Sequence, residues 1–163
     1  MDEKDTVILR ELQKNSRIAS GDIAVMLETD EREVETRIAA LQAAGILRRC
    51  TAVIDYGAAG EGAVSVILSL KVTQEKGLGY DGIAARLARF PQVQSIYLLT
   101  GTYDFQVIIN GTSMAEVSRF VAEQIASLDG VRETMTQIVM KTYKEQGTEM
   151  SRPGSRDRQL ISF

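Results

Sequence analysis

The chain has 163 residues, enough for one domain or two small ones, and its 44% apolar and 25% charged residues are typical of a globular protein. Histidine is absent and Cys50 is the single cysteine, which excludes histidine-based triads, intrachain disulfides and metal sites built from histidine or several thiolates. The net charge of −3 argues against a surface covered in basic patches. We expect no enzyme, no cofactor and no metal site.

No targeting or membrane segment is evident. The first five residues are charged and lack the apolar core of a signal peptide. The longest uncharged stretch, residues 90–103, is shorter than the ~20 apolar residues that a membrane helix needs. Together with the free cysteine, this predicts a cytoplasmic protein without a membrane partner.

The first 45 residues follow helical periodicity and predict three short helices. The first is expected to end near Asn15, and Ser20 is the expected N-cap of the second. Asp30 and Glu33 have the D-x-x-E spacing of a capping box and mark the start of the third helix. Gly45 is expected as its C′ residue.

Residues 46–54 are rich in β-branched side chains and predict a strand. Residues 1–55 are therefore expected to form three helices with a β wing, a unit that fits either a winged helix-turn-helix or a plain helical cap on the second domain. Residues 56–62, which are rich in glycine and other small residues, are expected to be a linker.

Residues 63–145 show a different periodicity and predict a second domain. The first expected elements are a strand at 64–72 and a helix at 83–88. Two strands follow at 93–100 and 103–110, joined by a two-residue turn at Gly101 and Thr102. A capping box at Ser113 and Glu116 then marks the start of a second helix, and the last strand is expected at 131–143. This β-α-β-β-α-β order is that of a ferredoxin-like split unit, which makes the whole chain α+β. Residues 146–163 are expected to be a C-terminal tail.

The third helix offers a surface suited to DNA. At ~100° per residue, Arg32 and Thr36 fall opposite its apolar face, and Glu35 lies on the flank. Arginine reads guanine edges, threonine reads several base edges, and a carboxylate accepts from cytosine N4. Residues 1–50, however, carry eight basic and ten acidic residues, so a solvated charged face is an equally open reading.

Arg48 and Arg49 lie where a wing would contact phosphates. From the residues alone, a solvated strand edge is the more common explanation of such a pair.

The segment around Gly101 has two interpretations. Backbone N–H groups exposed by a glycine turn suit a carboxylate and Asp104 suits an ammonium, so the loop is complementary to a zwitterionic amino acid. From the residues alone, the simpler interpretation is a hairpin in which Gly101 supplies a positive φ.

On the last predicted strand, Thr134 and Thr136 share one face while Met135 lies on the other. Both faces are partly apolar. One should pack on the two helices, and the other needs a cover, for which a partner subunit is the economical answer.

Taken together, these patterns resemble the Lrp/AsnC (feast/famine) family of transcription regulators over nearly the whole chain. The residues that carry the resemblance are Ile8, Leu9, Leu12, Asn15 and Arg17; Ile23 and Ala24; Val34, Arg37, Ile38, Leu41, Gly45 and Ile46; Ala52, Ile54 and Asp55; Pro91 and Val93; Thr100, Gly101, Tyr103 and Asp104; and Gly130 and Val131. One departure is Glu28, at a turn position where many relatives have glycine.

The resemblance implies a regulator that binds double-stranded DNA, forms a homodimer with further assembly left open, and responds to a small effector, typically an amino acid. The implied DNA-binding residues are Arg32, Glu35, Thr36, Arg37, Arg48 and Arg49. The implied effector-binding residues are Gly101, Tyr103 and Asp104, with Thr134 and Thr136 as weaker additions.

Two alternatives stay open. The acidic third helix also fits a metabolite sensor or interaction module that does not bind DNA. A related branch of the family resembles sirohaem decarboxylases, and the lack of histidine counts against that enzyme.

Overall fold

The structure is a computed structural model that describes residues 1–56, 58–59, 64–73 and 79–150. It separates into two compact units, Met1–Val53 and Ile54–Phe163, which are described one at a time. Among the described residues, no helix is long and apolar enough to span a membrane.

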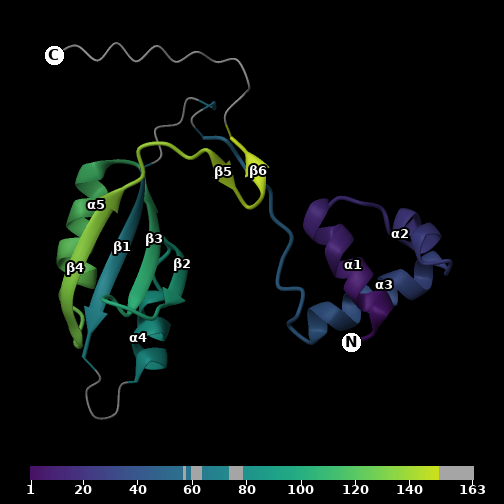
Figure 1. The fold of residues 1–163 in the computed structure, drawn as a ribbon, viewed down its shortest axis with the longest axis horizontal. Coiled ribbons are helices and arrows are strands. Elements are labelled where there is room, and N and C mark those ends of the chain that lie inside the picture. The colour runs from purple at the N-terminus through teal and green to yellow at the C-terminus, as the bar shows by residue number, and fades with distance from the viewer. Residues whose placement is uncertain (57, 60–63, 74–78, 151–163) are drawn as a thin grey trace. The chain divides into compact units, whose positions relative to one another are not determined.

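The first unit is a three-helix domain formed by α1 (Glu3–Lys14), α2 (Ser20–Met26) and α3 (Glu31–Ala43) (Figure 1). One buried apolar cluster holds the helices together, and it is made of Ile8, Ile23, Ala24, Val34 and Leu41. The predicted helix-turn-helix is confirmed, because α2 and α3 are joined by a short turn and both pack on α1 through this cluster.

The ends of α3 follow the predicted capping signals. The Asp30 carboxylate accepts from the backbone N–H of Glu33 at 2.8 Å, so Asp30 is the N-cap. At the other end Gly45 has φ +68°, its N–H donates to the Gln42 carbonyl at 2.9 Å, and the Ile46 N–H donates to the Leu41 carbonyl at 3.0 Å. These bonds make a Schellman motif, which stops the helix sharply.

Two predictions for this unit are wrong. Ser20 is the first residue of α2 rather than its N-cap, which is Ala19 and makes no side-chain cap. Residues 46–54 form no strand, so no wing is present in the described structure. Strand propensity needs a neighbouring strand to accept its hydrogen bonds, and residues 1–56 contain no second strand.

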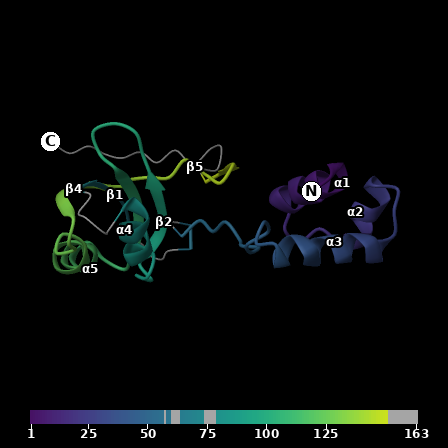
Figure 2. The same cartoon turned by 90° about the horizontal axis from the view of Figure 1, so that it is seen from below.

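The second unit is an antiparallel sheet with two helices on one face (Figures 1 and 2). In chain order its elements are β1 (Val64–Val72), α4 (Tyr80–Leu87), β2 (Val93–Leu98), β3 (Phe105–Gly111), α5 (Met114–Phe120), which continues as a π-helical turn at Val121–Ile125, and β4 (Val131–Ile138). The strand order β2-β3-β1-β4 confirms the predicted ferredoxin-like split unit.

The core of this unit lies between the sheet and the two helices. Val66, Leu68 and Leu70 alternate along β1 and are fully buried. In the pairing of β1 with β3, these residues lie opposite Ile109, Val107 and Phe105, which face the same side of the sheet. The helices cover this layer with Ile83, Leu87, Val117, Phe120 and Ile125.

The end of the chain differs from the prediction. The last core strand ends at Ile138 instead of residue 143, because β1 begins at Val64 and the Val139 N–H already bonds to the Ser65 carbonyl at 2.9 Å. A small hairpin of β5 (Lys144–Glu145) and β6 (Thr148–Glu149) follows, at the point where a tail was expected. The predicted tail residues 151–163 lie outside the described residues.

Candidate functional site

The exposed face of α3 carries the side chains predicted to contact DNA. Arg32, Glu35 and Thr36 are all exposed. The Thr36 hydroxyl donates to the Arg32 carbonyl at 2.7 Å, which leaves its oxygen lone pairs free to accept. Beside them lies an open hollow of about 450 Å³ lined by Asp30, Arg32, Glu33, Thr36 and Arg37. The helix therefore presents an arginine and a hydroxyl next to a surface depression.

Arg37, predicted in the same group, is engaged within the unit. Its Nη1 donates to Asp2 Oδ2 at 2.8 Å and to Asp5 Oδ1 at 2.9 Å, and its Nε donates to Glu33 Oε1 at 2.9 Å. Only 26% of the Arg37 side chain is exposed. We call Asp2, Lys4, Asp5, Glu33 and Arg37 the α1–α3 charge cluster. Arg37 therefore differs from the exposed residues of α3 because three carboxylates hold its guanidinium.

Glu33 is the centre of this cluster. Hydrogen bonds from Thr29, Arg37 and Lys4 lower the pKa of Glu33 to about 2. The pKa of Arg37 is raised above its usual value by Asp2, then Glu33 and Asp5. The D-x-x-E spacing predicts that Glu33 belongs to a capping box, but its carboxylate bonds to the Thr29 hydroxyl, to Arg37 and to Lys4. The capping-box spacing is local in sequence, so it could not predict the bond between Glu33 and the distant Lys4.

The turn between α2 and α3 is strained at one position. Glu28 has φ +50°, in the left-handed region that favours glycine. This is the position at which the sequence departs from the family pattern. The Thr29 N–H still bonds to the Ala24 carbonyl at 3.0 Å, so the turn closes at a backbone cost.

Arg48 and Arg49 follow α3 as exposed residues on an irregular segment. The Arg48 guanidinium lies beside Gly45, 3.4 Å from the point where a β-carbon on that glycine would sit. Neither arginine forms an ion pair within the described part of the chain.

The β2–β3 connection is longer than the predicted two-residue turn. The strands stop pairing at Leu98 and Phe105, the Leu99 N–H bonds to the Asp104 carbonyl at 2.8 Å, and residues 100–103 close the loop. Gly101 is exposed and has φ +127°, a conformation that only glycine adopts readily.

Asp104 holds this loop to two other elements. Its Oδ2 accepts from the Val72 backbone N–H at 2.8 Å, at the end of β1, and its Oδ1 accepts from the Tyr80 hydroxyl at 3.2 Å, at the start of α4. Both carboxylate oxygens are therefore already hydrogen-bonded inside the unit.

The structure does not gather all five predicted effector residues. The Tyr103 hydroxyl donates to the Met135 sulfur at 3.6 Å, and Met135 is paired with Ser69 on the sheet face away from the helices. Thr134 and Thr136 pair with Leu70 and Leu68, so they lie on the opposite face. Within this chain the threonines and Tyr103 are separated by the sheet.

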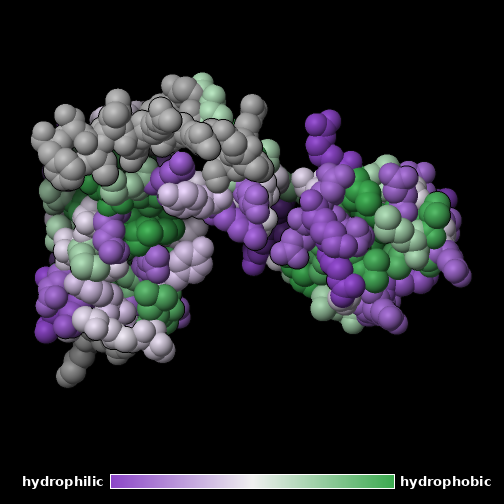
Figure 3. Space-filling view, turned by 45° about the horizontal axis from the view of Figure 1, so that its top comes forward, coloured by the Kyte–Doolittle hydropathy of each residue, from purple (hydrophilic) through white to green (hydrophobic). Residues whose placement is uncertain are grey.

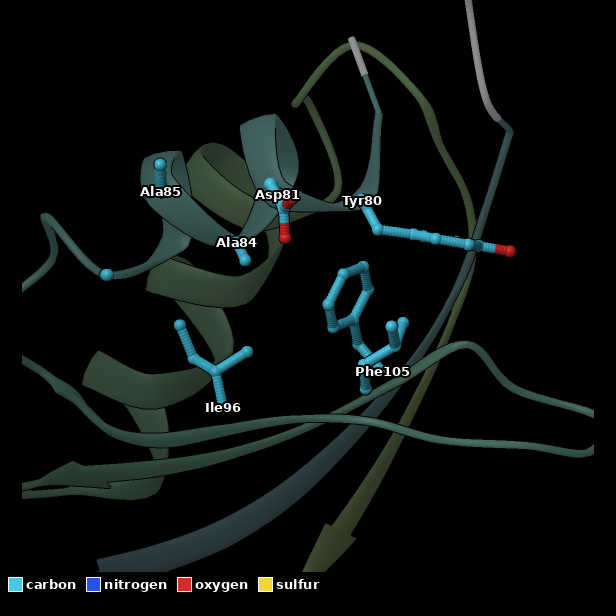
Figure 4. A pocket seen from close by; sticks show the side chains of 8 residues that line it. Tyr80, Asp81, Ala84, Ala85, Ile96 and Phe105 are labelled. Carbon is cyan, nitrogen blue, oxygen red and sulfur yellow. The ribbon is translucent and has the colours of Figure 1, made fainter.

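A second hollow, which no sequence pattern predicted, opens between α4 and the strands. It measures about 420 Å³ and is lined by Tyr80, Asp81, Ala84, Ala85, Ala88, Ile96, Leu98 and Phe105. Figure 4 shows Ile96 and Phe105 facing Ala84 of α4, with the Tyr80 hydroxyl pointing away from the hollow. The Tyr80 and Phe105 rings meet edge to face at 5.8 Å. Ala84 and Ala88, one helical turn apart, were the signal for this hollow in the sequence.

The sheet face opposite the helices is only partly covered. A row of paired residues crosses it from Tyr97 through Gln106 and Ser69 to Met135. Tyr97 is 52% exposed and Met135 38%. Hydrophobic residues also show between hydrophilic ones on the visible face of the second unit in Figure 3.

A three-helix helix-turn-helix unit joined to a ferredoxin-like unit defines a class of two-domain regulators. The comparisons with known proteins identify the family. Residues 1–42 match the AsnC-type helix-turn-helix domain, and residues 65–149 match the Lrp/AsnC ligand binding domain. The chain belongs to the Lrp/AsnC family of helix-turn-helix transcriptional regulators.

Three relatives illustrate the match. YugG, named as an HTH-type transcriptional regulator of Bacillus subtilis, is 37% identical over 160 residues, which cover 98% of this chain and 96% of YugG. FL11 of Pyrococcus horikoshii is 34% identical over 145 residues, 89% of this chain and 93% of FL11. A Neisseria meningitidis transcriptional regulator solved as its L-Met complex has a TM-score of 0.70 at 25% identity and covers 94% of this chain and 96% of its own.

Proposed function

We propose that the protein is a sequence-specific, DNA-binding transcription regulator of the cytoplasm that responds to a small metabolite, an amino acid, through its second unit. The observation that carries the proposal is the exposed Arg32 and Thr36 face of α3 in a helix-turn-helix unit. The N-terminal residues of a recognition helix are those that meet base edges in the major groove, and both side chains lie in the first half of α3.

On this proposal Arg32 reads a guanine, and Thr36 and Glu35 contact neighbouring base edges. Arg48 and Arg49 contact phosphates from the segment that follows α3. Arg37 is left out of the contact set because three carboxylates hold its guanidinium.

The effector is proposed to bind at the β2–β3 loop. Exposed N–H groups around Gly101 suit the carboxylate of an amino acid, and Asp104 offers its remaining lone pairs to the ammonium. A relative crystallised with L-Met supports an amino acid as the ligand class. Thr134 and Thr136 would join the site only from a neighbouring subunit, because the sheet separates them from Tyr103 within one chain.

We also propose a homodimer, with higher assembly left open. The support is the sheet face bearing Tyr97 and Met135, which neither α4 nor α5 covers. A second copy would bury these side chains, and pairing of two subunits would bring two recognition helices to one DNA site.

The test is fluorescence anisotropy with the full chain and labelled DNA from the protein's own upstream region, against random DNA of equal length, across a salt series. We expect tighter binding to the upstream DNA, weakened by salt and altered by one of the twenty amino acids. Arg32→Ala should reduce the preference for upstream DNA by about tenfold, equivalent to one lost base contact of about 1–3 kcal/mol.

Equal binding to both DNAs at every salt concentration would overturn the DNA-binding proposal. If amino acids then still changed the assembly state in light scattering, the chain would be a metabolite sensor that does not bind DNA.

A further inference from the structure

We propose that Arg37 is a positioning residue for DNA recognition, and that the three carboxylates around it raise the affinity for DNA although they are negatively charged. The proposal rests on the DNA-binding function proposed above. On this proposal the two arginines of α3 have different roles: Arg32 contacts a DNA base, and Arg37 holds α3 in position against α1.

The geometry shows how fully Arg37 is used. A guanidinium has five N–H donors in a planar fork, and three of them are hydrogen-bonded, one to the N-cap Asp2 of α1, one to Asp5 within α1 and one to Glu33 within α3. The carboxylates come from Asp2, the N-cap of α1, and from Asp5 in its first turn, both more than thirty residues away in sequence. A DNA phosphate would have to displace one of these carboxylates or approach through the remaining Nη2.

The cluster extends to the turn that precedes α3. Lys4 on α1 donates to Glu33 at 3.1 Å and to the Thr29 hydroxyl at 3.5 Å, and the Thr29 hydroxyl donates in turn to Glu33. Hydrogen bonds to Glu33 therefore connect the start of α1, the α2–α3 turn and the first half of α3. This is the half of α3 that carries Arg32 and Thr36.

Apolar packing alone would leave this half of α3 less constrained. Of the buried residues of the first unit, α3 contributes only Val34 and Leu41. Apolar contacts are non-directional, so they fix the distance between two helices more strictly than they limit the rotation or sliding of one helix against the other. Directional bonds from Arg37 and Glu33 supply the missing constraint, since productive recognition geometry tolerates errors of only about 0.5 Å.

The hollow on α3 brings the proposed DNA-contacting residues and the charge cluster together on one surface. Glu33 and Arg37 line it together with Arg32 and Thr36, so the charge cluster forms part of the surface against which the contact residues stand. Arg32 has no ion pair with any residue that the structure describes, whereas Arg37 has three. The free arginine is the one available to a base.

Charge makes the proposal testable, because its prediction opposes simple electrostatics. Removing a carboxylate near DNA reduces repulsion from the phosphates and should tighten binding if the carboxylate has no other role. If Asp5 and Glu33 position α3 through Arg37, their neutral variants should bind more weakly.

The experiment measures the affinity of the full chain for its upstream DNA across a salt series, for wild type, Arg37→Gln, Arg37→Lys, Asp5→Asn, Arg32→Gln and the double variant Arg32→Gln/Arg37→Gln. Arg119→Gln, an exposed arginine on α5, controls for the loss of one positive charge. Circular dichroism melts ensure that every variant is folded at the temperature used, and Asp5→Asn keeps the test open if Arg37→Gln does not fold.

We expect Arg37→Gln and Asp5→Asn each to weaken binding by about tenfold with an unchanged salt slope, a size reasonable for a misplaced recognition group. Arg37→Lys should be nearly as weak as Arg37→Gln, because a lysine cannot bond three carboxylates in a planar fork. Arg32→Gln should cost much less in the Arg37→Gln background than in wild type, since a displaced Arg32 has little left to lose.

The opposite pattern would overturn the proposal: a salt slope reduced by about 1 in Arg37→Gln, near-normal binding by Arg37→Lys, and unchanged or tighter binding by Asp5→Asn. That pattern would make Arg37 a phosphate contact. Failure of the underlying DNA-binding function is a separate result, because wild type itself would then show no preference for the upstream DNA.

Discussion

The two units of this protein are stabilised in different ways. In the second unit, twelve buried residues form a layer between a four-stranded sheet and two helices. The first unit buries only five, Ile8, Ile23, Ala24, Val34 and Leu41, and adds caps and a charge cluster that joins α1 to α3. A small core leaves more of the stability to directional and electrostatic bonds, so the first unit should respond more strongly to acid and salt.

The largest expected effect is a truncation in the larger core. Phe105 is 1% exposed and packs edge to face on Tyr80. Phe105→Ala should destabilise the second unit by about 3–5 kcal/mol, because it leaves a cavity that a sheet cannot readily close. Chemical denaturation followed by circular dichroism measures the loss. Leu98→Ala, at a residue that is 56% exposed, is the matched control and should cost under about 1 kcal/mol. Equal losses would mean that the core is not where the structure puts it.

Acid should affect the first unit selectively. The folded pKa of Glu33, about 2, lies below its ordinary value of 4.5. Its contribution to stability is therefore fully present above pH 4.5 and is lost as the pH falls from there through about 2. Hydrogen exchange at stepwise lower pH should show α1 and α3 opening before the sheet of the second unit.

Glu33→Gln provides the corresponding variant. It should lower the stability of the first unit at neutral pH and flatten its pH dependence in this acid range. A variant that retained the full acid dependence would assign that dependence to other carboxylates.

The strained turn offers a stabilising change. Glu28→Gly should stabilise the first unit by up to about 1 kcal/mol, because glycine adopts φ +50° without the steric cost that a β-carbon imposes. Thermal melting measures the gain. Glu28→Ala removes the charge but keeps the β-carbon and should bring no comparable gain. If alanine and glycine stabilised equally, repulsion among acidic residues rather than backbone strain would be the cause.

An effect of similar size is expected at the link between the effector loop and α4. Tyr80→Phe removes the hydroxyl that donates to Asp104 at 3.2 Å, at a cost of about 0.5–1.5 kcal/mol to the second unit. The bond from the Val72 N–H to Asp104 would remain. Denaturation midpoints compared with those of Tyr97→Phe, at an exposed tyrosine whose hydroxyl makes no hydrogen bond with the residues that the structure describes, isolate the hydroxyl contribution. If Tyr80→Phe shifted the denaturation midpoint no more than Tyr97→Phe does, the bond from Tyr80 to Asp104 would add nothing to stability.

Local pattern was sufficient for most of the architecture. The spacing of Asp30 and the glycine at 45 placed both ends of α3 correctly, because a cap acts within one helical turn. The alternation of Val66, Leu68 and Leu70 identified β1 and its buried face for a similar reason. The same local signals misled at residues 46–54 and at the end of β4, where a strand depends on a partner that the pattern does not contain.

The site residues show the limit most clearly. Arg32 and Arg37 look alike in the sequence, and both are predicted to contact DNA, although the helical angles single out only Arg32. The folded chain separates them, because Asp2 and Asp5 approach Arg37 from more than thirty residues away. Thr134 and Thr136 are likewise divided from Tyr103 by the pairing of β4 with β1. Residue types and periodicity thus established the helices, strands and chemical candidates, whereas the partners of each charged or polar group depended on long-range contacts that no local spacing encodes.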